Sequence, residues 1–151
     1  MKAAIFISIL IISSFLICSC KKSSSAIAYY WTVNDTTFQP TNMLYYAYGF
    51  NANDANSNLL NISFLNDSAP AGKYVVYPDT AINKSTNHVL SCIVDVFTQN
   101  GSHFYISTGK PGDSVTIGYE NGKMKAALKN ISLIDSSNSI VTVSANLYSQ
   151  Q

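Results

Sequence analysis

Side chains that could perform acid–base or nucleophilic chemistry are few in this chain of 151 residues. Histidine occurs only at His88 and His103, and the acidic residues number eight. A serine hydrolase needs a nucleophile, an imidazole base and an orienting carboxylate in mutual contact. Ser91, His103 and Asp95 supply these three types, but no Gly-x-Ser-x-Gly motif surrounds the serine. Each histidine follows a polar turn segment and opens an expected strand, so the sequence favours a non-enzymatic protein.

Metal-binding chemistry has no stronger support. Residues 51–58, Asn-Ala-Asn-Asp-Ala-Asn-Ser-Asn, alternate oxygen-bearing side chains as some calcium loops do. The segment has one carboxylate, no glycine at the turn and no closing glutamate, so a polar hairpin loop is the preferred interpretation. His88 and His103 would lie far apart along paired strands, which argues against a shared metal ion. We therefore expect no metal site and no cofactor.

Three cysteines complete the reactive inventory, at Cys18, Cys20 and Cys92. Cys92 lies in the apolar run 89–94, so we expect a buried, unreactive small side chain. Cys18 and Cys20 instead follow a basic start and an almost unbroken apolar run over residues 3–17. That run has the length of a signal-peptide core and is short for a permanent membrane span.

The residues before Cys20 resemble the lipobox of bacterial lipoproteins. Ile17 supplies an aliphatic side chain three positions before the cysteine, and Ser19 supplies a small one immediately before it. Cys18 fits the pattern poorly, because a phenylalanine and an isoleucine would occupy those two positions. In that family the chain is cut just before the cysteine, which then carries the lipids. The resemblance thus implies that Cys20 is the lipidated residue.

The resemblance also implies an organisation and a location. Residues 1–19 would be the signal peptide, 20–27 a Ser-rich tether and 28–151 a single folded domain. Lys21 stands where inner-membrane lipoproteins typically carry aspartate, so the outer membrane is the expected location. Whether the domain would face the periplasm or the cell surface stays open.

The mature chain further resembles small lipoproteins of Bacteroidota-type bacteria. The shared features are the lysines after Cys20, the absence of arginine, the Gly-Lys-Tyr-Val strand start at 72–75 and a closing hairpin around 121–123. The resemblance covers most of residues 28–148. It implies an all-β cell-envelope domain and assigns no catalytic residue.

Aromatic residues are in surplus, with ten tyrosines, seven phenylalanines and one tryptophan. They cluster at 29–31 and 45–50, and successive rings on a strand point to opposite faces of the sheet. One interpretation is that tyrosine simply packs well on a pleated surface and tolerates a wet edge. The other is an exposed platform for a sugar or peptide. The candidate platform residues are Tyr29, Trp31, Tyr45, Tyr46 and Tyr48.

The Asp-Thr and Asp-Ser pairs at 35–36, 67–68, 79–80 and 113–114, with the residue after each, resemble the O-glycosylation motif of Bacteroidota extracytoplasmic proteins. Each lies at an expected turn or strand start, where a glycan could be exposed. The same pairs also favour turns for local hydrogen-bonding reasons, which is the competing interpretation. The residues that would be modified are Thr36, Ser68, Thr80 and Ser114.

Charge narrows the choice of partners. The chain has nine lysines, no arginine and a formal net charge of +1, and its lysines are dispersed. A nucleic-acid partner is therefore not expected, because such proteins need a basic face with arginine. The expected partners are a membrane, through the lipid on Cys20, and an envelope glycan or protein.

Strand signals recur along the whole domain and predict an all-β fold. Asn-Gly pairs at 100–101 and 121–122 predict tight hairpins. An antiparallel β-sandwich and an open, barrel-like meander of about eight or nine strands both fit the pattern. The expected strands are 28–33, 43–50, 59–65, 73–77, 88–98, 102–108, 114–119, 123–134 and 139–147.

The expected strand 123–134 contains a change of phase. Met124, Ala126 and Leu128 share one face, but Ile131 and Leu133 are apolar at the opposite parity. One extra residue near 129–130 would restore the inward face, which predicts a β-bulge there. Taken together, the sequence predicts a membrane-anchored envelope lipoprotein acting as a non-enzymatic binding or structural module. A hydrolytic accessory enzyme, for example one that processes glycans, is the alternative.

Overall fold

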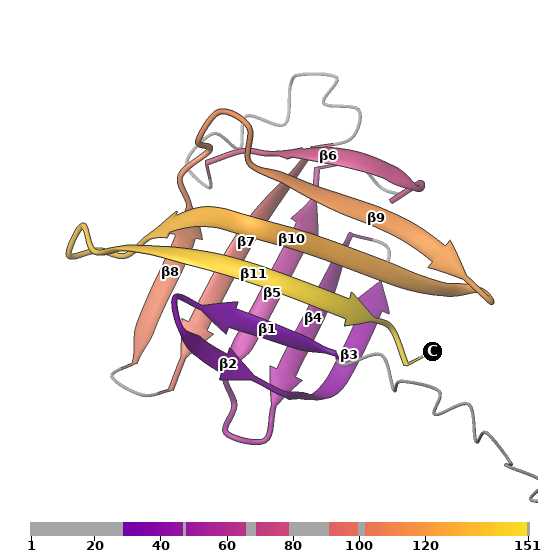
Figure 1. The fold of residues 1–151 in the computed structure, drawn as a ribbon, viewed down its shortest axis with the longest axis horizontal. Helices are drawn as coiled ribbons and strands as arrows, with labels where there is room; N and C mark the ends of the chain where they lie inside the picture. Colours follow the sequence, from indigo (N-terminus) through magenta and orange to yellow (C-terminus); the bar gives the residue numbers. More distant parts are fainter. Residues whose placement is uncertain (1–28, 47, 66–68, 79–90, 100–101, 151) are drawn as a thin grey trace, which may run out of the picture.

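The computed structural model describes residues 29–46, 48–65, 69–78, 91–99 and 102–150, and the fold is all-β (Figure 1). The order of strand pairing is β2-β1-β11-β10-β9-β6-β7-β5-β4-β3, and β8 pairs with both β10 and β7. The strands are β1 (Tyr30–Val33), β2 (Thr36–Phe38), β3 (Pro40–Tyr46), β4 (Gly49–Asp54), β5 (Leu59–Phe64), β6 (Gly72–Val76), β7 (Ser91–Thr98), β8 (His103–Ser107), β9 (Ser114–Glu120), β10 (Lys123–Ile134) and β11 (Ile140–Tyr148).

Two pairings of β8 close part of this sheet on itself. β8 pairs with β7 along its length and with the last residues of β10, at Leu133 and Ile134. Strands β10, β9, β6, β7 and β8 therefore form a closed ring. Closure satisfies the edge hydrogen bonds that an open sheet would leave exposed. The expected barrel-like and sandwich-like features are thus combined in one fold.

The remaining strands extend the ring into two layers. The first layer contains β2, β1, β11, β10, β9 and β6, and the second contains β8, β7, β5, β4 and β3. In Figure 1 the strands of the first layer run across the view, and those of the second cross behind them at a steep angle. Only Gln39 separates β2 from β3, so the chain passes directly from one layer to the other. The core lies between the layers.

Alternation of apolar residues explains which face each strand buries. In β11 the residues Val141, Val143, Ala145 and Leu147 are buried, and the residues between them are half-buried or exposed. The same alternation holds at Val115 and Ile117 of β9. A sheet with one face against the core and the other in solvent buries every second residue of each strand. This part of the expected pattern is confirmed.

The predicted β-bulge is confirmed in β10. Pairing of β10 with β11 shifts register between Leu128 and Ile131, and Asn130 has a φ of 52°. Its backbone N–H donates to Ser144 Oγ at 2.9 Å, which fixes the bulge to β11. As a result Leu128 and Ile131 both face the core. The Asn121-Gly122 hairpin between β9 and β10 is confirmed as well.

The aromatic segment 43–50 differs from the prediction of a single strand. It contains the end of β3 and the start of β4, which form a hairpin in which Tyr46 pairs with Gly49. Strand β4 then continues through Asn51, Asn53 and Asp54, which the sequence had placed in a loop. Asparagine disfavours strands in general, but Asn51 and Asn53 avoid burial because they point to the wet face, and the Asp54 carboxylate accepts hydrogen bonds in the turn that follows. Strand β2 was not expected either.

One strand pair is parallel, in contrast to the predicted antiparallel sheet. Val75 and Val76 of β6 pair in parallel with Ser91 and Cys92 of β7. Parallel neighbours need a long connection, and residues 77–90 lie between these two strands. Since β6 also pairs with β9, it joins two parts of the sheet that are distant in sequence.

The bulge gives a direct test of the fold. A valine at position 130 would have to adopt a left-handed backbone conformation, which costs a β-branched residue about 1–3 kcal/mol. Asn130→Val should therefore lower the free energy of unfolding by about 1–2 kcal/mol. In Asn130→Gly the glycine adopts the left-handed conformation readily and keeps the backbone N–H. The loss of unfolding free energy should therefore stay at about 0.5 kcal/mol. Urea denaturation measures both, and equal losses would contradict the bulge.

Candidate functional site

The five candidate platform residues occupy different environments. Trp31 is fully buried and stacks on Phe38, with ring centroids 4.1 Å apart, so it belongs to the core and cannot form an exposed platform. Its outward-facing neighbours in β1 are exposed or half-buried. The side chain points inward because Trp31 and Val33 share the apolar parity of that strand.

The other four candidates are at least partly exposed. Tyr48 is the most exposed of them, at 56%. Tyr45 contacts Tyr119 edge-on at 6.4 Å, and burial raises the pKa of Tyr119, whose hydroxyl donates to the carbonyl of Ala69. Tyr29 stacks on Tyr148 in the first layer. Tyr46 alone adjoins a groove, so the structure does not gather the five residues into one platform.

Strand register instead builds a different site on the outer face of the second layer. Asn51 of β4 pairs with Asn61 of β5, and Asn61 pairs with Asp95 of β7. These three polar side chains form a row across three neighbouring strands. In the next row along β7, Phe97 pairs with Phe104 of β8. Directly opposite residues in paired strands have neighbouring side chains, so each row is a continuous surface.

This surface is hollowed into a groove of about 310 Å³, called here the amide groove. Side-chain amides and a carboxylate form its floor, and aromatic rings stand at its two sides. The residues that line it are Tyr46, Asn51, Leu59, Asn61, Asp95, Phe97 and Phe104.

Hydrogen bonds hold the polar floor in place. The Tyr46 hydroxyl lies 3.3 Å from Asn51 Oδ1 and 3.2 Å from Asn61 Oδ1. The Asn61 amide donates to Ser63 Oγ at 2.9 Å and lies 3.3 Å from Asp95 Oδ2. Burial raises the pKa of Tyr46, and the nearby Asp95 carboxylate acts in the same direction. The phenol is therefore a neutral hydrogen-bonding group at physiological pH.

Glycine at position 49 allows the Tyr46 ring to lie where it does. A Cβ at Gly49 would come within 2.6 Å of Tyr46 Oη and 2.9 Å of the Ile62 carbonyl oxygen. The tyrosine ring thus crosses the strand pair directly above a residue with no side chain. This close approach brings its hydroxyl to the asparagine row.

The amide groove has the chemistry for polar, uncharged ligands. Side-chain amides both donate and accept hydrogen bonds, and a carboxylate accepts them through two oxygens. Aromatic rings offer flat apolar faces beside these groups. Phe104 is 54% exposed, so its ring is accessible to a ligand in the groove. Sequence reasoning missed the groove, because its residues lie on five strands and no motif joins them.

A second, larger cleft of about 910 Å³ lies at the end of the barrel where the β1–β2, β4–β5 and β7–β8 turns meet. Its lining is mostly neutral and polar, with Thr36 and Asn56 among the contributors. His103 reaches the same cleft and stacks on Tyr105, with centroids 5.7 Å apart. His103 is the histidine of the described residues, and its ring also contacts a carboxylate.

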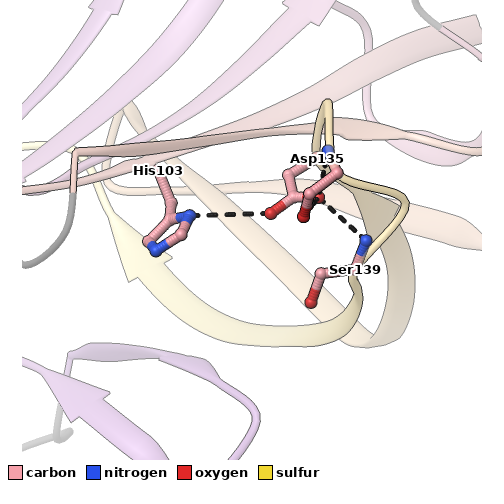
Figure 2. Close-up of polar contacts among 4 residues, drawn as sticks. His103, Asp135 and Ser139 are labelled. Atoms are coloured by element: carbon pink, nitrogen blue, oxygen red, sulfur yellow. Dashed lines mark hydrogen bonds and ion pairs between the residues drawn. The ribbon is translucent and has the colours of Figure 1, made fainter.

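Figure 2 shows that carboxylate, Asp135, between His103 and the β10–β11 turn. His103 Nδ1 lies 3.5 Å from Asp135 Oδ2. The other oxygen, Oδ1, accepts from the backbone N–H groups of Ser137 and Ser139 at 2.9 and 2.8 Å, and from Ser137 Oγ at 2.7 Å. The hydrogen bond from the Ser137 side chain, then those from the turn backbone, lower the pKa of Asp135, and His103 adds to the effect.

The structure brings together a histidine and a carboxylate, but not the nucleophile that a serine hydrolase also needs. Ser91 and His103 lie at opposite ends of the β7–β8 hairpin, because His103 pairs with Thr98 and Ser91 begins β7. Asp95 points to the amide groove, so the three residues of the sequence-level triad do not meet. Within the described residues, no serine, threonine or cysteine side chain is hydrogen-bonded to His103. Cys92 is buried, as expected, and burial raises the pKa of its thiol to about 12.

The asparagine-rich segment after β4 forms a polar hairpin turn, as preferred from the sequence. Asp54 Oδ1 accepts from the backbone N–H groups of Asn56 and Asn58, and Asp54 Oδ2 accepts from the Asn58 amide. Asn58 also accepts from the N–H of Gln99, which joins this turn to the β7–β8 turn. No group of three or more histidine, cysteine or acidic side chains suited to a metal ion occurs among the residues that the structure describes.

Of the remaining predicted modification and site residues, some lie within the described residues and some outside them. Thr36 is exposed at the start of β2, and Ser114 is half-buried at the start of β9. The predictions on Cys20, Ser68, Thr80 and His88 lie outside the described residues. O-glycosylation therefore stays a prediction.

Comparisons of the chain with protein-family models, curated proteins and solved structures found no match. In the ranges that the structure describes, no helix has the length and apolar character needed to cross a bilayer.

The Asp135 turn gives a test by pH. Its pKa is lowered on folding, so the charged carboxylate stabilises the fold above its unfolded pKa, and this contribution disappears as the pH falls through the folded pKa. Asp135→Asn keeps an oxygen acceptor for the turn but has no charge to lose. Between about pH 5 and pH 2, wild type should lose more unfolding free energy than Asp135→Asn. Urea denaturation across this range measures it, and parallel curves would contradict the assignment.

Proposed function

We propose that this protein is a lipid-anchored cell-envelope module that binds a neutral glycan in the amide groove. The observation that carries the proposal is the row of Asn51, Asn61 and Asp95 between aromatic side walls. Sugar rings present hydroxyl groups at their edges and apolar C–H groups on their faces. Amides and a carboxylate match the hydroxyls, and exposed aromatic rings match the C–H faces.

Charge supports a neutral rather than an acidic glycan. Asp95 is the ionisable acid of the groove, and the strands of the second layer contain no lysine. A sulfated or uronic sugar would meet a carboxylate with no cation to offset it, which disfavours binding. A groove of about 310 Å³ is at the small end for ligand sites and suits one or two sugar rings of a longer chain.

A binding role is favoured over a hydrolytic one. Among the described residues, no hydroxyl or thiol is hydrogen-bonded to His103. The Ser137 hydroxyl donates to Asp135 Oδ1, the carboxylate oxygen that also accepts from the turn backbone. The amide groove contains one carboxylate, whereas most glycosidases use two. These side chains can hold a sugar, and they lack the second acid–base group that cleavage of its glycosidic bond needs.

Glycan binding can be tested with an array of soluble neutral oligosaccharides beside uronic and sulfated ones. The acylated protein should bind the neutral oligosaccharides in preference to the uronic and sulfated ones. Phe104→Ala removes an exposed aromatic wall and should weaken retention by about tenfold, the size expected for loss of an aromatic contact with its buried area. Ile140→Ala changes another exposed apolar residue, on β11 and away from the groove, and is the control that should leave retention unchanged. Preference for acidic glycans, or retention unaffected by Phe104→Ala, would refute the proposal.

The lipid anchor is tested separately. Metabolic labelling with an alkyne fatty acid should modify the protein, and the label should disappear in Cys20→Ala because the acylated thiol is gone. Cys18→Ala is the control and should keep the label, since Cys18 would leave with the signal peptide. Label retained in Cys20→Ala would exclude the assignment.

A further inference from the structure

The two layers of the fold carry opposite charge. Strands of the first layer contain four lysines and one acid, Glu120. Strands of the second layer contain no lysine, and Asp95 is the acid on their outer face, since Asp54 at the end of β4 lines the end cleft instead. A chain with a net charge of only +1 thus presents a basic side and an acidic side. The amide groove lies on the acidic side.

Strand register places the basic residues on one surface. Lys73 of β6 pairs with Thr116 of β9, Thr116 with Ala127 of β10, Ala127 with Asn146 of β11, and Asn146 with Tyr30 of β1. Alternation along each strand puts the other lysines on that surface too. We call it the lysine–tyrosine face. Its residues are Tyr29, Tyr30, Lys73, Lys123, Lys125, Lys129 and Tyr148.

The first described residue of the domain lies on this face. Tyr29 stacks on Tyr148 with ring centroids 5.7 Å apart. The amines of Lys125 and Lys123 lie 5.5 and 6.0 Å from the centroid of the Tyr148 ring. The chain that leads back to Cys20 therefore joins the domain beside its lysines. In Figure 1 the start of β1 and the end of β11 lie close together at one side of the first layer.

We propose that the lysine–tyrosine face rests on the surface of the anchoring membrane, against anionic lipid headgroups, and that the amide groove points away from it. This rests on the lipid anchor of the proposed function. Eight residues separate Cys20 from Tyr29, so the covalent tether can span at most about 30 Å. At that distance the domain must meet the membrane with one of its sides.

Charge and side-chain type decide which side. Lysines near an anionic surface are attracted to it within a Debye length of about 8–10 Å, and acidic residues are repelled. Tyrosine is favoured at the headgroup level because its ring is apolar and its hydroxyl is polar. Glu120 forms an ion pair with Lys125, which leaves Lys73, Lys123 and Lys129 to contact headgroups. A single acyl chain binds weakly, and a basic patch is the kind of second contact that strengthens such binding.

The test compares lysine accessibility on two membranes. The acylated protein is placed in nanodiscs of zwitterionic lipid alone or with anionic lipid added, and amine acetylation is quantified for each lysine by mass spectrometry. Lys73, Lys123 and Lys129 should react at least about threefold more slowly on the anionic discs. Lys110, exposed in the loop between β8 and β9, is the internal control and should be unchanged.

Variants with fewer lysines distinguish protection by docking of this face from protection by mere proximity to the membrane. Lys123→Gln with Lys129→Gln should reduce the protection of Lys73 on anionic discs to below about 1.5-fold, whereas Lys110→Gln should leave it intact. Equal reactivity on both discs, or equal protection of Lys110, would overturn the orientation while leaving the anchor and the groove untouched. Intact mass is read first, and a protein without an acyl group would overturn the anchor and the orientation together. Glycan binding by the soluble-array assay is independent of either result.

Discussion

The bulge in β10 is the constraint on which the rest of the fold depends. Before it, Met124, Ala126 and Leu128 face the core and pair with β9 and β11; after it, Ile131 and Leu133 face the same core. Without the extra residue the second half of the strand would turn its apolar side chains to solvent. That half is also where β10 pairs with β8 and closes the ring. A single residue in a left-handed conformation therefore links core formation to barrel closure.

Much of this could be predicted from the sequence, and the exceptions have physical causes. The alternation of β9, β10 and β11 predicted the strands and the bulge, because one buried face requires a period of two, and the Asn121-Gly122 pair predicted the hairpin. The hairpin of β3 and β4 was missed because Tyr46 and Gly49 form its turn within an aromatic run. Asparagine was assigned to loops by its average preference, which does not hold on a solvated sheet face. The parallel pairing of β6 with β7 joins residues across a long connection, and no local pattern encodes that choice.

The candidate site shows the same limit. Tyr46 and Trp31 were both predicted as platform residues because they are aromatic, but Tyr46 is exposed and Trp31 lies in the core. The difference is parity along the strand, since a shift of one residue exchanges the two faces. Asn61 and Asp95 lie more than thirty positions apart in sequence and become neighbours only through the pairing of β5 with β7. A site built by register across strands is invisible to motif searches, however strong each strand prediction is.

The division of chemistry between the two outer faces follows from how an all-β domain uses its residues. Alternate positions are committed to the core, so functional side chains must come from the outward positions of each layer. In this chain those positions hold asparagine, aspartate and phenylalanine on one layer and lysine and tyrosine on the other. Under the proposed anchoring, a domain held near its lysines would offer only the opposite face freely to a soluble ligand. The groove of amides and rings lies on that opposite face, where the fold places no lysine that an anionic surface could attract.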